Sequence, residues 1–209
     1  MTNLTSNLQS ENIVWHSGHV THKDRCELLK QYPKTLWFTG LSASGKSTLA
    51  YAAERALLDK GYVCYVLDGD NVRHGLNSNL GFSDLDREEN IRRVAEVAKL
   101  MNDAGLIVLT SFISPSHKDR ELAKSIIGKD KFFEIHMSTP INICEKRDPK
   151  GMYKKARSGE IKNFTGISAN YDIPTSPFLR LDISNLNVSD AVERLISSLD
   201  IVDPKDQEA

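Results

Sequence analysis

The stretch TLWFTGLSASGKST, residues 35–48, decides the fold, because an apolar run, a glycine-containing loop and the start of a helical pattern follow one another directly. Within it, Gly40, Gly45, Lys46 and Ser47 fit the spacing G-x-x-x-x-G-K-[ST] of a phosphate-binding loop between a strand and a helix. Glycines let successive backbone N–H groups turn inward, and the helix adds its positive N-terminal end. A plain glycine turn would explain Gly40 alone. The loop therefore predicts binding of ATP or GTP.

The same loop supplies two side chains for a bound nucleotide. Lys46 is expected to reach the β and γ phosphates, and the Ser47 hydroxyl is expected to bind Mg²⁺. Two classes of nucleotide-binding protein are disfavoured by what the sequence lacks. A regulatory GTPase needs a guanine-reading N-K-x-D segment, which the chain does not contain. A motor-type ATPase normally carries an acidic residue at the end of a neighbouring hydrophobic strand, and the run 106–112 ends without one.

Around this loop, five apolar runs alternate with helical patterns, which is typical of a parallel sheet with crossover helices. The runs cover residues 35–39, 63–68, 106–112, 132–137 and 179–183. Helices are expected from the phosphate loop to Gly61, from Ser83 to Gly105, around 117–127, after Pro140, and from Val188 to Leu199. The sequence thus predicts an α/β fold with a five-stranded parallel sheet and helices on both faces.

No internal repeat or linker divides the chain, so residues 1–209 are interpreted as one domain. Residues 1–12 and 203–209 are polar and aperiodic, and we expect them to be flexible. The stretch from about 147 to 177 is rich in Lys, Arg and Gly, ends in prolines and has little strand patterning. We interpret it as a mobile lid.

Composition limits the possible partners. The 27 Lys+Arg and 28 Asp+Glu residues leave a formal net charge of -1, so no overall charge excess favours nucleic acid. No run approaches the roughly 20 apolar residues of a membrane span, and the first residues do not resemble a signal peptide. The three cysteines form no CxxC pair and are expected to be reduced thiols. We therefore expect a cytoplasmic protein with no nucleic-acid or membrane partner.

Three histidines near the N-terminus are spaced by three residues, at His16, His19 and His22. Such spacing can place metal ligands together when it falls on an ordered element. We see no helical signal in this segment, however, and interpret the histidines as solvated polar residues.

Polar side chains follow the second apolar run. The segment LDGDNVR places Asp68 and Asp70 at a strand's carboxyl end, where open α/β sheets bind their ligands. One carboxylate can accept the proton of an acceptor hydroxyl while the other orients hydrated Mg²⁺; a turn built on Gly69 is the alternative. A cluster suited to a nucleotide-like anion follows: Arg73, Phe82, Arg87 and Asn90.

The third apolar run leads into SFISPSHKDR, which brings Ile113 and Ser114 to the same edge. The Ser114 hydroxyl has three possible uses: contact with a phosphate, a covalent relay, or a helix cap. Direct transfer between two nucleotides in one cleft needs no relay, so we favour contact. Arg92 and Arg93 fit either the anion-binding cluster or a solvated helix face with i,i+4 pairs.

The segments GLSASGKST, LDGDNVRHGLN, LGFS, DREENIRR, SFISP, RDPKGMYKKARSGEIKNFTGI and YDIP occur in one order and together resemble the adenylyl-sulfate kinase family. The resemblance runs from about Trp15 to the last predicted helix. It implies a P-loop kinase fold and MgATP-dependent phosphorylation of the 3'-hydroxyl of adenosine 5'-phosphosulfate (APS). The products would be 3'-phosphoadenosine 5'-phosphosulfate (PAPS) and ADP, in sulfate assimilation. It also implies a stand-alone kinase that forms a homodimer.

The resemblance also implies roles for single positions, with Asp70 as the base and Phe82 and Phe164 as an aromatic clamp on the acceptor adenine. Ser114 falls at the position traditionally described as a phosphoserine, a role that we disfavour. Two alternatives remain, another small-molecule or nucleoside-monophosphate kinase and a nucleotide sensor without catalysis. The implied catalytic residues are Asp70, Lys46 and Ser114, and the Mg²⁺ ligands are Ser47 and possibly Asp68. The implied ATP-binding residues are Gly40, Leu41, Ser42, Ala43, Ser44, Gly45, Lys46, Ser47, Thr48 and Arg147. The implied acceptor-binding residues are Asp70, Asn71, Arg73, Phe82, Arg87, Asn90, Ile113, Ser114, Lys150, Asn163 and Phe164.

Overall fold

The computed structural model describes residues 13–199, so both ends that were expected to be flexible lie outside the described residues. Its centre is one sheet in the order β2-β3-β1-β4-β5, with every neighbouring pair parallel. The strands are β1 (Thr35–Thr39), β2 (Cys64–Asp68), β3 (Ile107–Ser111), β4 (Phe132–Met137) and β5 (Leu179–Leu181). The five-stranded parallel sheet predicted from the apolar runs is confirmed.

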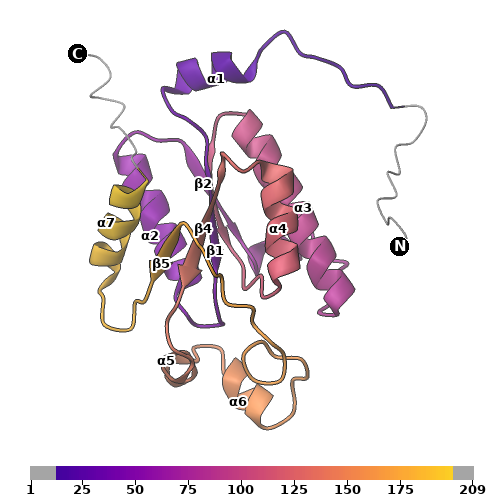
Figure 1. The fold of residues 1–209 in the computed structure, drawn as a ribbon, viewed down its shortest axis with the longest axis vertical. Helices are drawn as coiled ribbons and strands as arrows, with labels where there is room; N and C mark the ends of the chain where they lie inside the picture. Colours follow the sequence, from indigo (N-terminus) through magenta and orange to yellow (C-terminus); the bar gives the residue numbers. More distant parts are fainter. Residues whose placement is uncertain (1–12, 200–209) are drawn as a thin grey trace.

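Helices cover both faces of the sheet, as expected (Figure 1). Helices α2 (Lys46–Asp59) and α7 (Val188–Ser198) lie on one face, and α3 (Asp84–Asp103) and α4 (His117–Ile127) on the other. Successive strand residues point to opposite faces. Accordingly, Leu36 and Phe38 of β1 pack into the apolar cluster with α2 and α7, whereas Trp37 packs with α3 and α4.

The helix boundaries follow the signals in the sequence. Ser83 precedes α3, and its hydroxyl accepts a hydrogen bond from the Asp86 backbone N–H at 3.2 Å. Gly61 and Gly105 follow α2 and α3 with φ angles of 90° and 93°, which glycine adopts without a Cβ clash. No helix within residues 13–199 is long and apolar enough to cross a membrane.

Helix α1 (His22–Leu29) was not expected, and the interpretation of this segment as free of helical signals was wrong. The Asp24 N–H donates to the Thr21 hydroxyl at 3.2 Å, and Asp24 Oδ2 accepts from the Thr21 N–H at 2.7 Å. These reciprocal bonds form a capping box, the one local signal in the sequence that marks this helix start. None of the α1 residues is buried, so the helix lacks the apolar stripe that revealed the others.

The expected lid segment, 147–177, is built around a small core of its own. Helices α5 (Ile141–Arg147) and α6 (Met152–Arg157) lie together at the end of the sheet to which β4 leads (Figure 1). Cys144 of α5, Tyr153 of α6 and Phe164, which follows α6, are buried in a third apolar cluster. The segment therefore holds more regular structure than its composition indicated.

Arg92 and Arg93, for which the sequence allowed two interpretations, lie on α3 and share the carboxylate of Glu89. Glu89 Oε2 accepts from Arg92 Nε and Glu89 Oε1 accepts from Arg93 Nε, both at 2.7 Å. This geometry favours the helix-face interpretation of Arg92 and Arg93. The same hydrogen bonds lower the pKa of Glu89 to about 2.

Replacing Glu89 by Gln is expected to lower the free energy of unfolding at pH 7 by less than about 1 kcal/mol, because the ion pairs are partly exposed. The folded pKa lies below the ordinary value of 4.5, so the stabilisation is present above pH 4.5 and is lost as the pH falls toward 2. Urea unfolding of both proteins at pH 7, 4 and 3 measures this difference. A difference that does not shrink on acidification would contradict the assignment.

Candidate active site

The backbone of the loop after β1 requires glycine at two positions. A Cβ on Gly40, where φ is 151°, would lie 2.7 Å from the carbonyl oxygen of Met137. A Cβ on Gly45, where φ is 97°, would lie 2.2 Å from the Ile183 side chain. Between them Ala43 also adopts a positive φ of 56°. The loop thus takes a conformation that few sequences allow.

Lys46 places a buried cation in this loop. Its Nζ donates to the carbonyl oxygens of Gly40 at 3.0 Å and Leu41 at 2.7 Å. Burial lowers the pKa of Lys46 to about 8. Both partners of this ammonium group are neutral carbonyl oxygens, so a polyphosphate would suit it as a counter-ion.

Ser47, Asp68 and Ser111 form a group of oxygen atoms beside the loop. Ser47 Oγ donates to Asp68 Oδ2 at 2.8 Å and lies 3.0 Å from Ser111 Oγ. The other Asp68 oxygen accepts from the backbone N–H groups of Asp70 and Asn71 at 3.0 and 3.4 Å. Oxygen ligands of this kind suit Mg²⁺, so the residues fit the expected metal site.

Asp70 differs from Asp68 in that its carboxylate is open to solvent. The Asp70 and Lys150 side chains are 66% and 65% exposed, and they form an ion pair with each other. This pair joins the end of β2 to the turn between α5 and α6. Next to Asp70, the Asn71 side-chain amide donates to the Tyr51 hydroxyl at 3.0 Å.

Two arginines line the region between β2 and α3. The Arg73 guanidinium lies over the Phe82 ring, 4.3 Å from its centroid. Arg87 Nε donates to the Phe82 carbonyl oxygen at 3.0 Å, and its terminal nitrogens donate to Thr165 Oγ1 at 3.1 Å and to the Asn163 carbonyl oxygen at 2.8 Å. Arg87 thus connects the loop before α3 with the segment that follows α6.

The two phenylalanines predicted as a clamp differ in accessibility. Phe82 is 69% exposed, whereas Phe164 is 8% exposed. The Phe164 ring packs edge-on against Tyr153, with 5.0 Å between ring centroids and 75° between ring planes. Phe82 is largely exposed, with Arg73 over one face of its ring, and Phe164 serves mainly the third apolar cluster.

Ser114 and Ile113 lie at the end of β3, as predicted. Ser114 is buried, has a φ of 38°, and its Oγ accepts from Trp37 Nε1 at 3.2 Å. The Ile113 carbonyl oxygen accepts from the Thr39 hydroxyl at 2.8 Å. The Ser114 hydroxyl therefore already has a partner inside the protein.

Two further predicted residues, Asn90 and Arg147, lie on different helices, α3 and α5. Asn90 is buried in α3, and its Oδ1 accepts from Asn77 Nδ2 at 2.9 Å. This bond fixes the orientation of the Asn90 amide. Arg147 donates to the carbonyl oxygen of Ile183 at 2.9 Å, beside Gly45 of the phosphate loop.

Sequence reasoning missed two residues that contact the site, Ser111 and Tyr153. Ser111 supplies a hydroxyl at the end of β3, where only an acidic residue had been sought. The Tyr153 hydroxyl donates to the Ser42 carbonyl oxygen at 3.0 Å and so ties α6 to the phosphate loop. Both positions lie within segments that carry the family resemblance, but no local pattern predicts their contacts, which depend on how distant segments pack.

A phosphate-binding loop between β1 and α2, with carboxylates at the end of β2 in the same parallel sheet and Asp68 bonded to Ser47 of the loop, defines a P-loop kinase. The sequence model of the adenylylsulphate kinase family matches residues 32–182. The adenylyl-sulfate kinase of Shewanella pealeana is 55% identical over 196 residues, which are 94% of this chain and 96% of that protein. The chain therefore belongs to the adenylyl-sulfate kinase family.

Solved structures agree with this assignment. The APS kinase of Mycobacterium tuberculosis in complex with AMPPNP and APS is 50% identical and superposes with a TM-score of 0.78 over 81% of this chain and 98% of that one. The hexameric APS kinase of Thiobacillus denitrificans is 31% identical, with a TM-score of 0.60 over 83% of this chain and 31% of that one.

Proposed function

We propose that this protein transfers the γ-phosphoryl group of ATP directly to the 3'-hydroxyl of APS, giving PAPS and ADP in cytoplasmic sulfate assimilation. The observation that carries the proposal is the position of Asp70, an accessible carboxylate at the end of β2, next to the phosphate loop. The Mycobacterium tuberculosis relative, solved with AMPPNP and APS, supports the same pair of substrates.

On the ATP side, the backbone N–H groups of residues 40–48 would hold the phosphates and Lys46 would offset their charge. Arg147, which lies beside Gly45, would cover the ATP base. Ser47, with Asp68 in support, would hold Mg²⁺, which when bound neutralises charge on the β and γ phosphates. Asp68 is held by two backbone N–H groups and the Ser47 hydroxyl, which suits an orienting role better than that of a base.

On the acceptor side, Asp70 would accept the proton of the 3'-hydroxyl as that oxygen attacks the γ-phosphorus atom and the bond to the β-phosphate oxygen breaks. Lys150 lies close enough to hold the carboxylate in place. Phe82 would stack on the adenine, with Phe164 on its other side once the 147–177 segment closes as a lid. The other acceptor contacts proposed are Asn71, Arg73, Arg87, Asn90, Ile113, Ser114 and Asn163.

Replacing Ser114 by Ala tests direct transfer. The Ser114 hydroxyl is buried and bonded to Trp37, so its loss is expected to lower kcat by no more than about tenfold, the scale of one neutral hydrogen bond. Steady-state kinetics measure this, and mass spectrometry of the wild-type protein after incubation with ATP would show no phosphoserine. Complete loss of activity, together with a phosphorylated Ser114 peptide in the wild type, would overturn direct transfer.

The reaction itself is tested by ADP release from MgATP with APS, AMP or shikimate as the acceptor. Turnover with APS alone, giving a product sensitive to a 3'-phosphatase, would support the proposal. Phosphorylation of AMP would keep the ATP site but reject the acceptor, and the absence of turnover with any acceptor would favour a nucleotide sensor.

We also propose that residues 1–209 act as one domain and assemble as a homodimer. A relative with a hexameric structure makes the assembly worth measuring directly. Light scattering of the purified protein distinguishes two subunits from six.

A further inference from the structure

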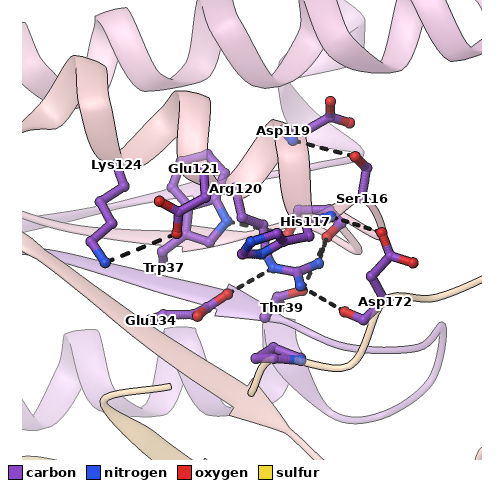
Figure 2. A network of polar contacts seen from close by, with 12 residues as sticks. Trp37, Thr39, Ser116, His117, Asp119, Arg120, Glu121, Lys124, Glu134 and Asp172 are labelled. Carbon is purple, nitrogen blue, oxygen red and sulfur yellow. Dashed lines mark hydrogen bonds and ion pairs between the residues drawn. The ribbon is translucent and has the colours of Figure 1, made fainter. Parts of the chain in front are cut away.

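Two segments have no role in the site described above. They are YDIP, residues 171–174, which belongs to the family resemblance, and residues 116–120 at the end of SFISPSHKDR, which include Arg120. The structure brings them together, with Arg120 bonded to Asp172 (Figure 2). At their centre Arg120 of α4 is 2% exposed, which is rare for a cation and requires strong compensation.

Arg120 contacts three separate parts of the chain. One terminal nitrogen donates to the carbonyl oxygens of Ser114 at 2.8 Å and Pro115 at 3.1 Å. The other donates to the carbonyl oxygen of Asp172 at 2.6 Å. Its Nε lies 2.7 Å from Glu134 Oε1 of β4, an ion pair poorly aligned for a hydrogen bond. The planar guanidinium fork thus spans the end of β3, the sheet and the YDIP segment at once.

The YDIP segment has further bonds to the same strand ends. The Asp172 N–H donates to the Pro115 carbonyl oxygen at 2.9 Å, and Asp172 Oδ2 accepts from the His117 N–H at 3.0 Å. These bonds attach the end of the 147–177 segment to the loop that carries Ser114.

Tyr171 makes the connection to β1. Its hydroxyl lies 3.0 Å from Thr39 Oγ1, and Thr39 donates in turn to the Ile113 carbonyl oxygen. Burial raises the pKa of Tyr171 to about 12, so the phenol keeps its proton at pH 7. Because the Thr39 hydroxyl hydrogen points to the Ile113 carbonyl oxygen, Tyr171 is the donor of this pair. The ring stacks on His136 at 5.9 Å, and burial lowers the pKa of His136 to about 4, so this neighbour is neutral at pH 7.

Several of these hydrogen bonds meet at Ser114, whose backbone conformation is unfavourable. Ser114 has a φ of 38°, a conformation that costs a non-glycine residue free energy and persists only where the surroundings enforce it. Arg120 and Thr39 both donate to the Ser114 carbonyl oxygen, at 2.8 and 3.3 Å. The Trp37 indole holds the side chain of the same residue.

We propose that Arg120 is a positioning residue that fastens the YDIP segment to the ends of β1 and β3 and thereby holds Ile113 and Ser114 in the geometry that binds the acceptor nucleotide. This inference rests on the proposed function, since it concerns the acceptor side of that reaction. It predicts that the Arg120 network affects binding of the acceptor nucleotide, whereas the contacts of α6 with the phosphate loop affect binding of ATP.

Two variants test this role, Arg120→Lys and Tyr171→Phe. Lysine keeps the charge but cannot reach three carbonyl oxygens and Glu134 together, and phenylalanine keeps the ring on His136 while removing the bond to Thr39. Each is expected to raise KM for APS about three- to tenfold and to change KM for ATP less than twofold. Should Arg120→Lys fail to fold, Tyr171→Phe alone decides the test.

Tyr153→Phe is the matched control, because it removes another buried tyrosine hydroxyl that bonds the Ser42 carbonyl oxygen on the ATP side. It is expected to raise KM for ATP more than KM for APS. If Tyr171→Phe and Arg120→Lys lower kcat or the melting temperature with both KM values unchanged, Arg120 is merely structural and the inference is wrong. Failure of the wild-type protein to phosphorylate APS would instead reject the proposed function.

Discussion

Replacing Asp70 by Asn is expected to lower kcat for PAPS formation by about two orders of magnitude or more, the usual scale for loss of a positioned base. Asparagine keeps the size of the side chain but cannot accept the proton of the 3'-hydroxyl. The dissociation constant for ATP should be nearly unchanged, because the phosphate loop makes no contact through Asp70. Steady-state kinetics and calorimetric titration with MgATP measure the two quantities separately.

Asp59→Asn is the matched control for this variant. The Asp59 carboxylate is 62% exposed and paired with Arg55 on α2, much as Asp70 is 66% exposed and paired with Lys150. Loss of an exposed ion pair alone should therefore leave kcat near the wild-type value in Asp59→Asn. If Asp70→Asn retained kcat within about fivefold of wild type, Asp70 would not be the base, and Asp68 would be the next carboxylate to replace.

The sheet and the phosphate loop were predictable because their signals are local. Leu36 and Trp37 pack to opposite faces because β1 is an apolar strand buried on both sides, and β3 is buried in the same way. Short apolar runs also mark the three other strands, which are only partly buried. The loop conformation was predictable because Gly40 and Gly45 have φ angles of 151° and 97°, which glycine adopts more readily than other residues. For the same reason, the spacing of glycine, lysine and serine identified the ATP side of the site before any contact was known.

The rest of the site depends on contacts between distant segments, which leave no local signal. Arg120 and Asp172 are 52 residues apart and meet only because α4 and the YDIP segment pack on the same strand ends. Phe164 differs from Arg120 because it lies in a recognisable motif. Its burial against Tyr153 was still not predictable, since that burial follows from the fold of the segment around it. Helix α1 escaped prediction because a capping box without an apolar stripe is a weak signal.

Replacing Lys46 by Met is expected to lower kcat/KM for ATP by about two to three orders of magnitude, the scale on which removal of one preorganised electrostatic donor acts. Methionine matches the apolar stem of lysine and removes a cation whose burial is costly, as its pKa of about 8 shows. The fold should therefore survive, with a melting temperature close to that of the wild type. Lys60→Met, at an exposed position directly after α2, is the control and should leave the kinetics unchanged.

The division of the Lys46→Met effect between kcat and KM tells which state the ammonium group stabilises. The ammonium group donates to the carbonyl oxygens of Gly40 and Leu41, which places it inside the phosphate loop. If it follows the charge that develops as the γ-phosphoryl group departs, the loss falls mainly on kcat. If it only holds bound ATP, KM rises and kcat stays. A loss below about tenfold in both would mean that the loop N–H groups suffice without Lys46.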